Sequence, residues 1–304
     1  METILETAQL TKRYGQSCAL RDLDMKVEKG SIYGLVGRNG AGKTTLIRIV
    51  CGLQRPSAGT YRLWGTRSDS PAITGMRRRM SAIVESPSMY MGLSAIDNIR
   101  QQYRILGRPS MDGAEMLLEL VGLGDTGRKK AASFSLGMKQ RLGIAIALAG
   151  DPDLLVLDEP TNGLDPQGII ELRELLLRLN RERQITLLIS SHNLDELSRL
   201  ATHYGFIDGG RMIREVSAEE LEAACRKCAR LTVSDVRILA RVLDGMQVEY
   251  KVLSDTQADV YARLNVSQLT LALDREGCEV TALEERDESL ESYYVNLVGG
   301  GRHA

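Results

Sequence analysis

Apolar and polar positions follow two patterns in residues 1 to about 215. Short continuous apolar runs at 32–36, 154–157 and 185–189 are typical of strands that are buried on both faces. Helical segments lie between these runs, and the one at 44–50 is closed by Gly52. This alternation predicts an α/β domain in which a mainly parallel sheet is flanked by helices.

Two segments interrupt the alternation. The stretch from about 87 to Ser133 lacks buried-strand runs, and we expect a helical subdomain at about 87–150. Further on, Asp208-Gly209-Gly210-Arg211 has the composition of a hairpin turn between strands at 204–207 and 212–216. Such an antiparallel edge would close a first domain at residues 1–216.

Residues 217–304 predict a second, smaller α+β domain. We expect strands at 231–233, 247–253, 259–262 and 278–283, with helices at 235–243 and 266–275 between them. This β-α-β-β-α-β order matches the ferredoxin-like pattern. A last helix is expected at 289–297, and a helix at 219–230 contains Cys225 and Cys228, a single C-x-x-C pair without the second pair that a zinc site needs.

Composition narrows the class of protein. The chain has 304 residues, of which 43% are hydrophobic and 26% charged, and a net charge of −1 gives no sign of a basic nucleic-acid surface. No apolar run approaches the roughly 18 residues that a membrane-spanning helix requires, and the first residues lack the features of a signal peptide. Five scattered cysteines do not indicate a disulfide framework. We therefore expect a cytoplasmic protein.

A phosphate-binding motif stands between the first buried strand and the following helix. Residues 37–44, Gly-Arg-Asn-Gly-Ala-Gly-Lys-Thr, fit the P-loop pattern G-x-x-x-x-G-K-[ST]. Its glycines let backbone N–H groups curl around phosphate oxygens at a helix N-terminus. We expect Lys43 to reach the β- and γ-phosphates of a nucleotide and the Thr44 hydroxyl to take one position on Mg²⁺.

Two further buried strands end in residues that suit nucleotide hydrolysis. Asp158 follows Leu154–Leu157 and would hold Mg²⁺ through water, and Glu159 would polarise the attacking water as a general base. His192 follows the strand at 185–189 and would donate a hydrogen bond to the γ-phosphate. Without the P-loop, these residues would read as solvated acids and a structural histidine at strand ends.

A third motif begins a long helix that continues to Leu148. Its sequence, Phe134-Ser135-Leu136-Gly137-Met138-Lys139-Gln140-Arg141, has Ser135 as an N-cap and Gly137 where a phosphate can approach the backbone closely. This run resembles the signature motif L-S-G-G-Q-K-Q-R of ATP-binding-cassette (ABC) ATPases. Gly163-Leu164-Asp165-Pro166 then resembles the D-loop of that family, His192 its switch histidine, and Tyr14 its adenine-stacking aromatic residue.

The resemblance covers residues 2–216 and implies a P-loop NTPase cassette whose two copies, in a homodimer or paired cassettes, bind ATP with Mg²⁺ between them. Each ATP would lie between the P-loop of one copy and Ser135, Gly137 and the D-loop Asp165 of the other. It also implies a separate transmembrane permease as partner, so that the chain would sit peripherally on the inner face of the membrane. The P-loop residues implied to contact the nucleotide are Asn39, Gly40, Ala41, Gly42, Lys43, Thr44 and Thr45.

Three positions depart from the family pattern. Leu136 replaces the first glycine of the signature, Met138 replaces glutamine, and Glu85 stands at the Q-loop position, where most members have a glutamine that touches Mg²⁺ and the attacking water. A carboxylate binds a hard cation more strongly than an amide oxygen does, which favours Glu85 as a Mg²⁺ ligand. It also adds negative charge near the triphosphate, and the sequence leaves open which of the two effects dominates. Through Glu85 and the segment Ser289–Tyr294, the chain resembles the ABC subgroup for bacitracin and lantibiotic transport and self-immunity.

Three functions remain open at this point. The resemblance implies the ATPase subunit of a bacterial-type exporter for a peptide antibiotic or drug. A soluble ABC ATPase acting on ribosomes or nucleic acid is the alternative, which the single P-loop, the short insertion and the near-neutral charge disfavour. A regulatory cassette that does not hydrolyse ATP is disfavoured by the intact Lys43, Asp158, Glu159 and His192.

Overall fold

The structure is a computed structural model that describes residues 2–108, 110–225, 228–261, 266–286 and 290–299. It divides into two compact units, residues 1–218 and residues 219–304, which we call the N-terminal unit and the C-terminal unit. The N-terminal unit has two sheets and the C-terminal unit has one, and each unit has its own hydrophobic core. No helix within the described ranges combines the length and the apolar character that crossing a membrane requires.

A six-stranded sheet forms the centre of the N-terminal unit, in the strand order β10-β9-β3-β8-β7-β6. Neighbouring strands are parallel except for the β9–β10 hairpin, so the predicted parallel sheet with an antiparallel edge is confirmed. The chain turns at Gly209 and Gly210, both with positive φ, as the hairpin motif predicted. The strands are β3 (Ile32–Val36), β6 (Met80–Ile83), β7 (Leu154–Asp158), β8 (Thr186–Ser191), β9 (His203–Asp208) and β10 (Arg211–Ser217).

A second, antiparallel sheet has the order β2-β1-β4-β5. Its two longest strands have 12 residues each and were not among the strands predicted from the sequence. Register shifts interrupt the β1–β2 pairing, and Gln9 and Asp22 take positive φ. These irregularities break the apolar–polar alternation that marks a long strand in a sequence. The strands are β1 (Thr3–Tyr14), β2 (Ser17–Glu28), β4 (Ala58–Leu63) and β5 (Thr66–Arg67).

The helix α1 (Lys43–Val50) lies in the core that joins the two sheets. Its buried residues Leu46, Ile47, Ile49 and Val50 share one cluster with apolar side chains of β1, β2, β3, β7 and β8. Burial of this kind supplies most of the stability of a short helix, because eight residues alone form few backbone hydrogen bonds. The core therefore fixes the helix that carries the phosphate-binding motif.

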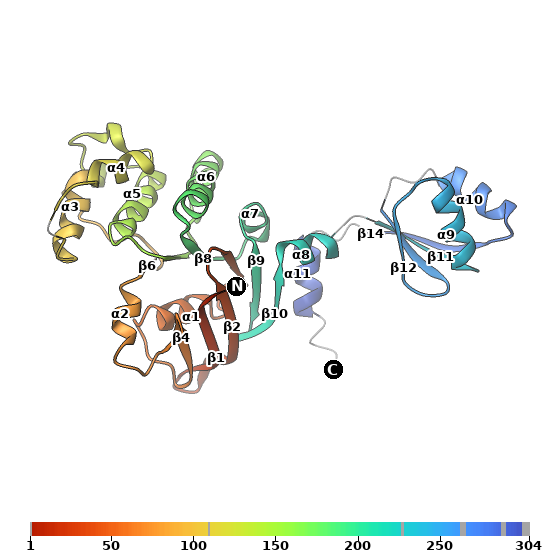
Figure 1. Cartoon of the computed structure of the whole chain (residues 1–304), viewed down its shortest axis with the longest axis horizontal. Helices are drawn as coiled ribbons and strands as arrows, with labels where there is room; N and C mark the ends of the chain where they lie inside the picture. Colours follow the sequence, from red (N-terminus) through yellow and green to blue (C-terminus); the bar gives the residue numbers. More distant parts are fainter. Residues whose placement is uncertain (1, 109, 226–227, 262–265, 287–289, 300–304) are drawn as a thin grey trace. The chain divides into compact units, whose positions relative to one another are not determined.

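Helices cover the other face of the six-stranded sheet (Figure 1). The stretch predicted to be helical contains α3 (Ala95–Ile105), α4 (Ala114–Leu120) and two short 3₁₀ turns, η1 (Gly124–Thr126) and η2 (Ala131–Ser133), and it leads into α5 (Leu136–Leu148). Further along the chain, α6 (Pro166–Arg183) and α7 (Leu194–Ser198) follow β7 and β8. A short helix, α2 (Ile73–Arg77), precedes β6.

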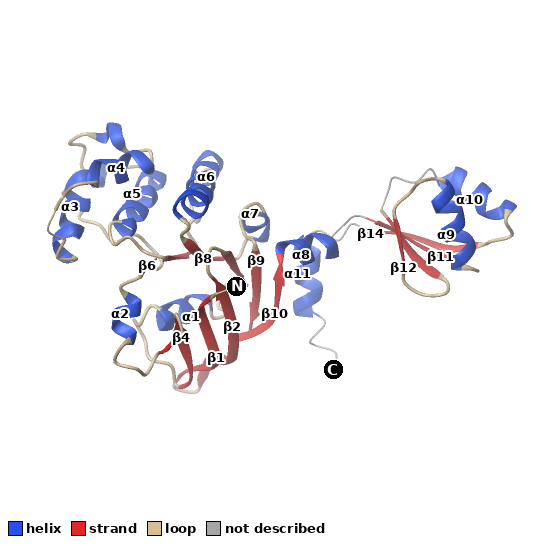
Figure 2. Ribbon diagram, in the orientation of Figure 1, coloured by secondary structure: helices blue, strands red, loops and turns tan. Residues whose placement is uncertain are grey.

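The C-terminal unit has the predicted β-α-β-β-α-β order, and its sheet has the order β12-β13-β11-β14 with antiparallel neighbours (Figure 2). Its core consists of side chains from the sheet and from both helices, among them Leu231, Leu239 and Leu273. The elements are α8 (Ala218–Ala224), β11 (Cys228–Val233), α9 (Val236–Gly245), β12 (Tyr250–Val252), β13 (Gln257–Val260), α10 (Val266–Arg275), β14 (Val280–Arg286) and α11 (Leu290–Gly299).

Two predictions for this unit were wrong in detail. The expected helix at 219–230 ends at Ala224, and Cys228 begins the strand β11, where it pairs with β14. The strand expected at 247–253 spans only Tyr250–Val252, because Gln247 takes a positive φ that interrupts an extended backbone. Positions 262 and 289, which ended or began predicted elements, lie outside the described residues.

Candidate functional site

The candidate site lies at the carboxyl edge of the six-stranded sheet. Parallel pairing sets Val36 beside Ser191, Ser190 beside Asp158, and Leu157 beside Ile83. The residues that follow β3, β8, β7 and β6 therefore emerge at one edge, which is where open α/β sheets bind ligands. The structure thus gathers the P-loop, Asp158, Glu159 and His192 as the sequence predicted.

The P-loop has the backbone conformation that its glycines allow. Gly40 and Gly42 have φ of 81° and 113°, values that other residues rarely adopt. A Cβ on Gly42 would lie 2.7 Å from the Ala19 carbonyl oxygen, and one on Gly37 would lie 2.6 Å from that of Ile207. Gly40 has open space around it. The loop is therefore held from β2 and β9 while its outer turn stays accessible.

The magnesium-side residues predicted from the sequence meet directly. The Thr44 hydroxyl donates to Asp158 Oδ2 at 2.8 Å, and the Ser190 hydroxyl donates to Asp158 Oδ1 at 2.6 Å. Asp158 is buried, and together with the burial of Cys51 its charge raises the pKa of that nearby thiol to about 12. Burial is the larger of the two causes. A hydroxyl and a carboxylate at this spacing fit a hard cation, which prefers oxygen ligands.

Glu159 lies between two other predicted residues. Its Oε1 is 3.1 Å from Lys43 Nζ, and its Oε2 is 2.8 Å from His192 Nδ1. Lys43 Nζ also donates to the Gly37 carbonyl oxygen at 2.6 Å. Glu159 has a φ of 49°, and its backbone N–H donates to the Ser190 hydroxyl and carbonyl oxygens. Because strain of this kind persists only where the surroundings impose it, Ser190 fixes the Glu159 backbone.

The signature and D-loop residues lie beside each other. Ser135 caps α5 by accepting from the Met138 N–H at 3.2 Å, and Asp165 caps α6 by accepting from the Gly168 N–H at 3.1 Å. A Cβ on Gly137 would have Leu164 Cδ2 as its nearest neighbour, at 3.8 Å. Within the described ranges, no hydrogen bond or ion pair joins Ser135 or Asp165 to the P-loop of the same chain.

Two predicted ligands have other partners. Tyr14 is 45% exposed, and its hydroxyl donates to Gln54, just beyond α1. Glu85 accepts from Arg48 Nη2 at 2.6 Å. Of the remaining P-loop residues, Asn39 is exposed, Ala41 is buried and Thr45 is half-buried.

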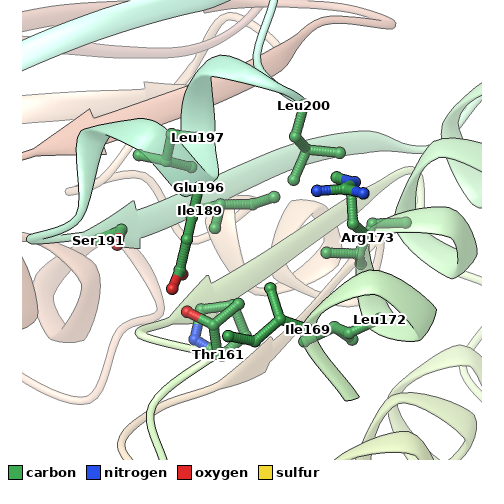
Figure 3. A pocket seen from close by; sticks show the side chains of 11 residues that line it. Thr161, Ile169, Leu172, Arg173, Ile189, Ser191, Glu196, Leu197 and Leu200 are labelled. Carbon is green, nitrogen blue, oxygen red and sulfur yellow. The ribbon is translucent and has the colours of Figure 1, made fainter. Parts of the chain in front are cut away.

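A small cavity near the edge is not the nucleotide site. Its volume is about 20 Å³, and it lies between α6, β8 and α7 (Figure 3). Apolar side chains line most of it, including Ile169, Leu172 and Leu197, with Thr161 and Glu196 at one end. This volume corresponds to about one water molecule, so the cavity is a small packing defect behind the strand end that leads to His192.

Two residues of the site were missed by the sequence analysis. Ser190 holds both Asp158 and the Glu159 backbone, and its position on a strand parallel to β7 gave the signal for it. Arg48 contacts Glu85 from four residues beyond Thr44, which is one turn further on the same face of α1.

Known proteins match the chain along its whole length. Residues 20–162 match the sequence model of the family described as ABC transporter. The bacitracin transport ATP-binding protein BcrA of Bacillus licheniformis is 40% identical over 99% of this chain and 99% of its own length. The chain belongs to the ATP-binding proteins of ABC transporters. BcrA of Enterococcus faecalis is 39% identical to this ABC ATPase over 99% of the chain and 98% of its own length.

Other relatives match only part of the ABC ATPase. The lantibiotic transport ATP-binding protein SrtF of Streptococcus pyogenes is 43% identical over 70% of the chain and 90% of its own length. Among solved structures, cbiO1 of Clostridium perfringens has a TM-score of 0.66 at 27% identity, over 73% of this chain and 92% of its own. The predicted ABC cassette fold and the ATPase class are confirmed, and membership among transporter subunits favours transport over a soluble ribosomal or nucleic-acid role.

Proposed function

We propose that this ABC ATPase powers the export of a peptide antibiotic, as a peripheral subunit on the inner face of the membrane. The relatives named for bacitracin transport match it over both units, and this whole-length match supports the substrate class. The meeting of Lys43, Glu159 and His192 at the sheet edge is the observation that carries the hydrolytic role. Residues 1–216, with a helical subdomain at about 87–150, form the ATP-binding domain, and 217–304 form an accessory domain.

The described residues divide the work of hydrolysis. Lys43 binds the β- and γ-phosphates of ATP, since its ammonium group is nearly buried at the base of the loop. Glu159 accepts a proton from water as the water oxygen attacks the γ-phosphorus and the bond from that phosphorus to ADP breaks. His192, 2.8 Å from Glu159, orients that carboxylate and donates to the γ-phosphate.

Magnesium fits the oxygen pair on α1 and β7. The Thr44 hydroxyl and the Asp158 carboxylate, 2.8 Å apart, would hold the ion, with Glu85 as an additional oxygen donor. When bound, Mg²⁺ neutralises charge on the β- and γ-phosphate oxygens. Ser190 keeps Asp158 in position by donating to its other oxygen.

Pairing of two cassettes completes each nucleotide site. Ser135 and Asp165 are exposed at the N-terminal ends of α5 and α6, and Gly137 leaves room for close approach of a phosphate. Backbone N–H groups at a helix N-terminus favour anions. These residues of one copy therefore contact the γ-phosphate of the ATP that the P-loop of the other copy binds. Tyr14 stacks on the adenine of the ATP.

A groove on the N-terminal unit is the docking surface for the permease. It has a volume of about 1000 Å³ and runs along α2, β6 and two parts of the helical subdomain, the end of α3 and the end of α5. Three arginines, Arg77, Arg78 and Arg108, line it with exposed Leu53 and Ile105, and no acidic residue is among its described lining. A helical segment of the permease that carries apolar and acidic side chains complements this surface.

Two measurements test the proposed function. The purified full-length chain should hydrolyse ATP, and Glu159→Gln should abolish turnover while ATP binding remains. Affinity purification of the tagged chain from membranes should recover a membrane-spanning protein. Recovery of ribosomes without such a protein would instead support the soluble alternative.

A further inference from the structure

Glu85 has a cationic partner outside the proposed magnesium site. Arg48 Nη2 donates to Glu85 Oε1 at 2.6 Å, and the two side chains are 35% and 64% exposed. Among the described residues, Arg48 is the partner of the Glu85 side chain in both its hydrogen bond and its ion pair. The carboxylate at the Q-loop position is therefore paired with a cation from α1.

Arg48 and the magnesium-side hydroxyl belong to the same helix. Thr44 and Arg48 are four residues apart on α1, so they lie on one face of it, one turn apart. Thr44 contacts Asp158, and Arg48 contacts Glu85. The helix that follows the P-loop thus holds both candidate acidic ligands, the first through a hydroxyl and the second through a guanidinium.

The backbone at Glu85 is held in a strained conformation. Its φ is 64°, and the Ser86 N–H donates to the Val84 carbonyl oxygen at 2.8 Å. A hydrogen bond from residue i+2 to residue i around a positive φ is a γ-turn, which is rare for a non-glycine residue. Such a conformation persists where neighbouring contacts hold it, and the Arg48 ion pair is a contact of this kind.

We propose that Arg48 is a positioning residue that holds Glu85 off the magnesium side of the nucleotide site, so that magnesium and Arg48 compete for this carboxylate. The inference rests on the proposed role of Glu85 as a magnesium-side ligand. A guanidinium and a divalent cation both bind carboxylate oxygens, and Glu85 Oε1 already accepts from Arg48, so a cation at this oxygen has to displace the guanidinium. Removal of Arg48 therefore frees Glu85 for the metal.

The test is a magnesium titration of nucleotide binding in the full-length chain. All variants carry Glu159→Gln, so that hydrolysis does not consume the nucleotide, and binding of a fluorescent ATP analogue is followed at increasing Mg²⁺. Arg48→Ala should lower the half-saturating Mg²⁺ concentration by about two- to fivefold, the effect of removing one exposed ion pair. Arg48→Lys should stay close to the parent, and Glu85→Gln should raise the concentration.

A double variant and a control make the result specific. With Glu85→Gln already present, Arg48→Ala should cause no further shift, because its competitor is gone. Arg79→Ala serves as the control, since Arg79 makes a similarly exposed ion pair of 2.7 Å with Asp153. Arg79 precedes the first residue of β6, whereas Glu85 follows its last residue. This variant should match the parent in its magnesium dependence.

Three results would overturn the inference, the first two in one way and the third in another. In the first, Glu85→Gln shifts the magnesium dependence and Arg48→Ala does not. In the second, Glu85→Gln shifts it, and Arg48→Ala shifts it equally with Glu85 present and with Glu85→Gln. In both cases Arg48 does not act through Glu85, and the metal role of Glu85 stands. If neither variant shifts it while the analogue still binds, Glu85 is not a metal ligand, and the inference fails together with that part of the proposed function.

Discussion

Lys43 is the residue on which phosphate binding depends most directly. Its nearly buried ammonium group contacts two P-loop carbonyl oxygens and Glu159, so its charge is already aimed into the site. Lys43→Ala should weaken ATP binding by about 10- to 100-fold, the effect of losing a hydrogen bond to a charged group. Isothermal titration calorimetry measures this, with Lys29→Ala, an exposed lysine paired with Glu2, as the control. Unchanged affinity in Lys43→Ala would contradict this assignment.

Cys51 gives a chemical test of how burial just beyond α1 raises the pKa of a thiol. The pKa of the thiol is raised from 9.0 to about 12, first by burial and then by Asp158, with Arg77 opposing. At pH 8 both values lie above the solution pH, so the reactive thiolate fraction falls by roughly a thousandfold relative to an ordinary thiol. Iodoacetamide should therefore modify Cys51 far more slowly in the folded chain than in urea, as peptide mass spectrometry would show. Equal rates would contradict this burial.

Individual site residues were predictable to the extent that their chemistry is local. The P-loop spacing and the acids after an apolar strand fixed Lys43, Thr44 and Asp158, and the structure brings Thr44 and Asp158 into contact. The contacts of Arg48 depend on how a helix and a loop 37 residues away pack together. No spacing in a single sequence states that distance, so such residues escape sequence reasoning.

At the level of elements, α7 connects the strand end at His192 to the helical layer. Leu197 on α7 is buried, lines the small cavity beside α6, and would be 3.2 Å from a Cβ on Gly34. Leu197→Ala enlarges an existing void, so it should lower the free energy of unfolding by about 2 to 5 kcal/mol.

Urea unfolding measures the stability of the Leu197→Ala variant. Ile170→Ala on α6 is the matched control, because Ile170 is 39% exposed, and it should change stability by less than about 0.5 kcal/mol. If both substitutions cost the same, α7 is not packed as described.

The elements predicted best were those buried on both faces. Every residue of strands β3, β7 and β8 is buried, because helices or a second sheet cover each side. The strands β1 and β2 were not predicted, because one side of each is solvated and bulges disturb their alternation. The prediction that the helix at 219–230 includes Cys228 was wrong, because strand pairing with β14 overrides local helix propensity.

At the scale of the whole molecule, the nucleotide-site residues all lie in the N-terminal unit. We propose that the C-terminal unit supports dimerisation or regulation. A chain ending at residue 218 should bind ATP as the full chain does, because its core is complete within that unit. Its ATP-dependent dimerisation should be weaker, measurable by analytical ultracentrifugation. Unchanged ATPase activity and dimerisation would remove both proposed roles.

The fold of the C-terminal unit was predictable from the sequence, but its function was not. The β-α-β-β-α-β order was visible in the pattern of apolar positions from Leu231 onward, and the sheet order agrees with it. A ferredoxin-like unit serves many functions, so its fold alone does not choose among them. The same holds for the transported substrate, which the permease would contact.

The central claim is that ATP joins two copies of this cassette through the P-loop of one and the signature helix of the other. Light scattering of Glu159→Gln with saturating MgATP tests it most directly, because this variant does not hydrolyse ATP and the dimer therefore does not dissociate. We predict a mass of about 67 kDa, twice the 33.5 kDa of the chain.

Adding Gly137→Glu should return the mass to 33.5 kDa. The new side chain has room within its own chain, where the nearest atom to a Cβ is 3.8 Å away, but it repels the γ-phosphate of the partner site. A monomeric Glu159→Gln chain at saturating MgATP, or a dimer that survives Gly137→Glu, would contradict the account.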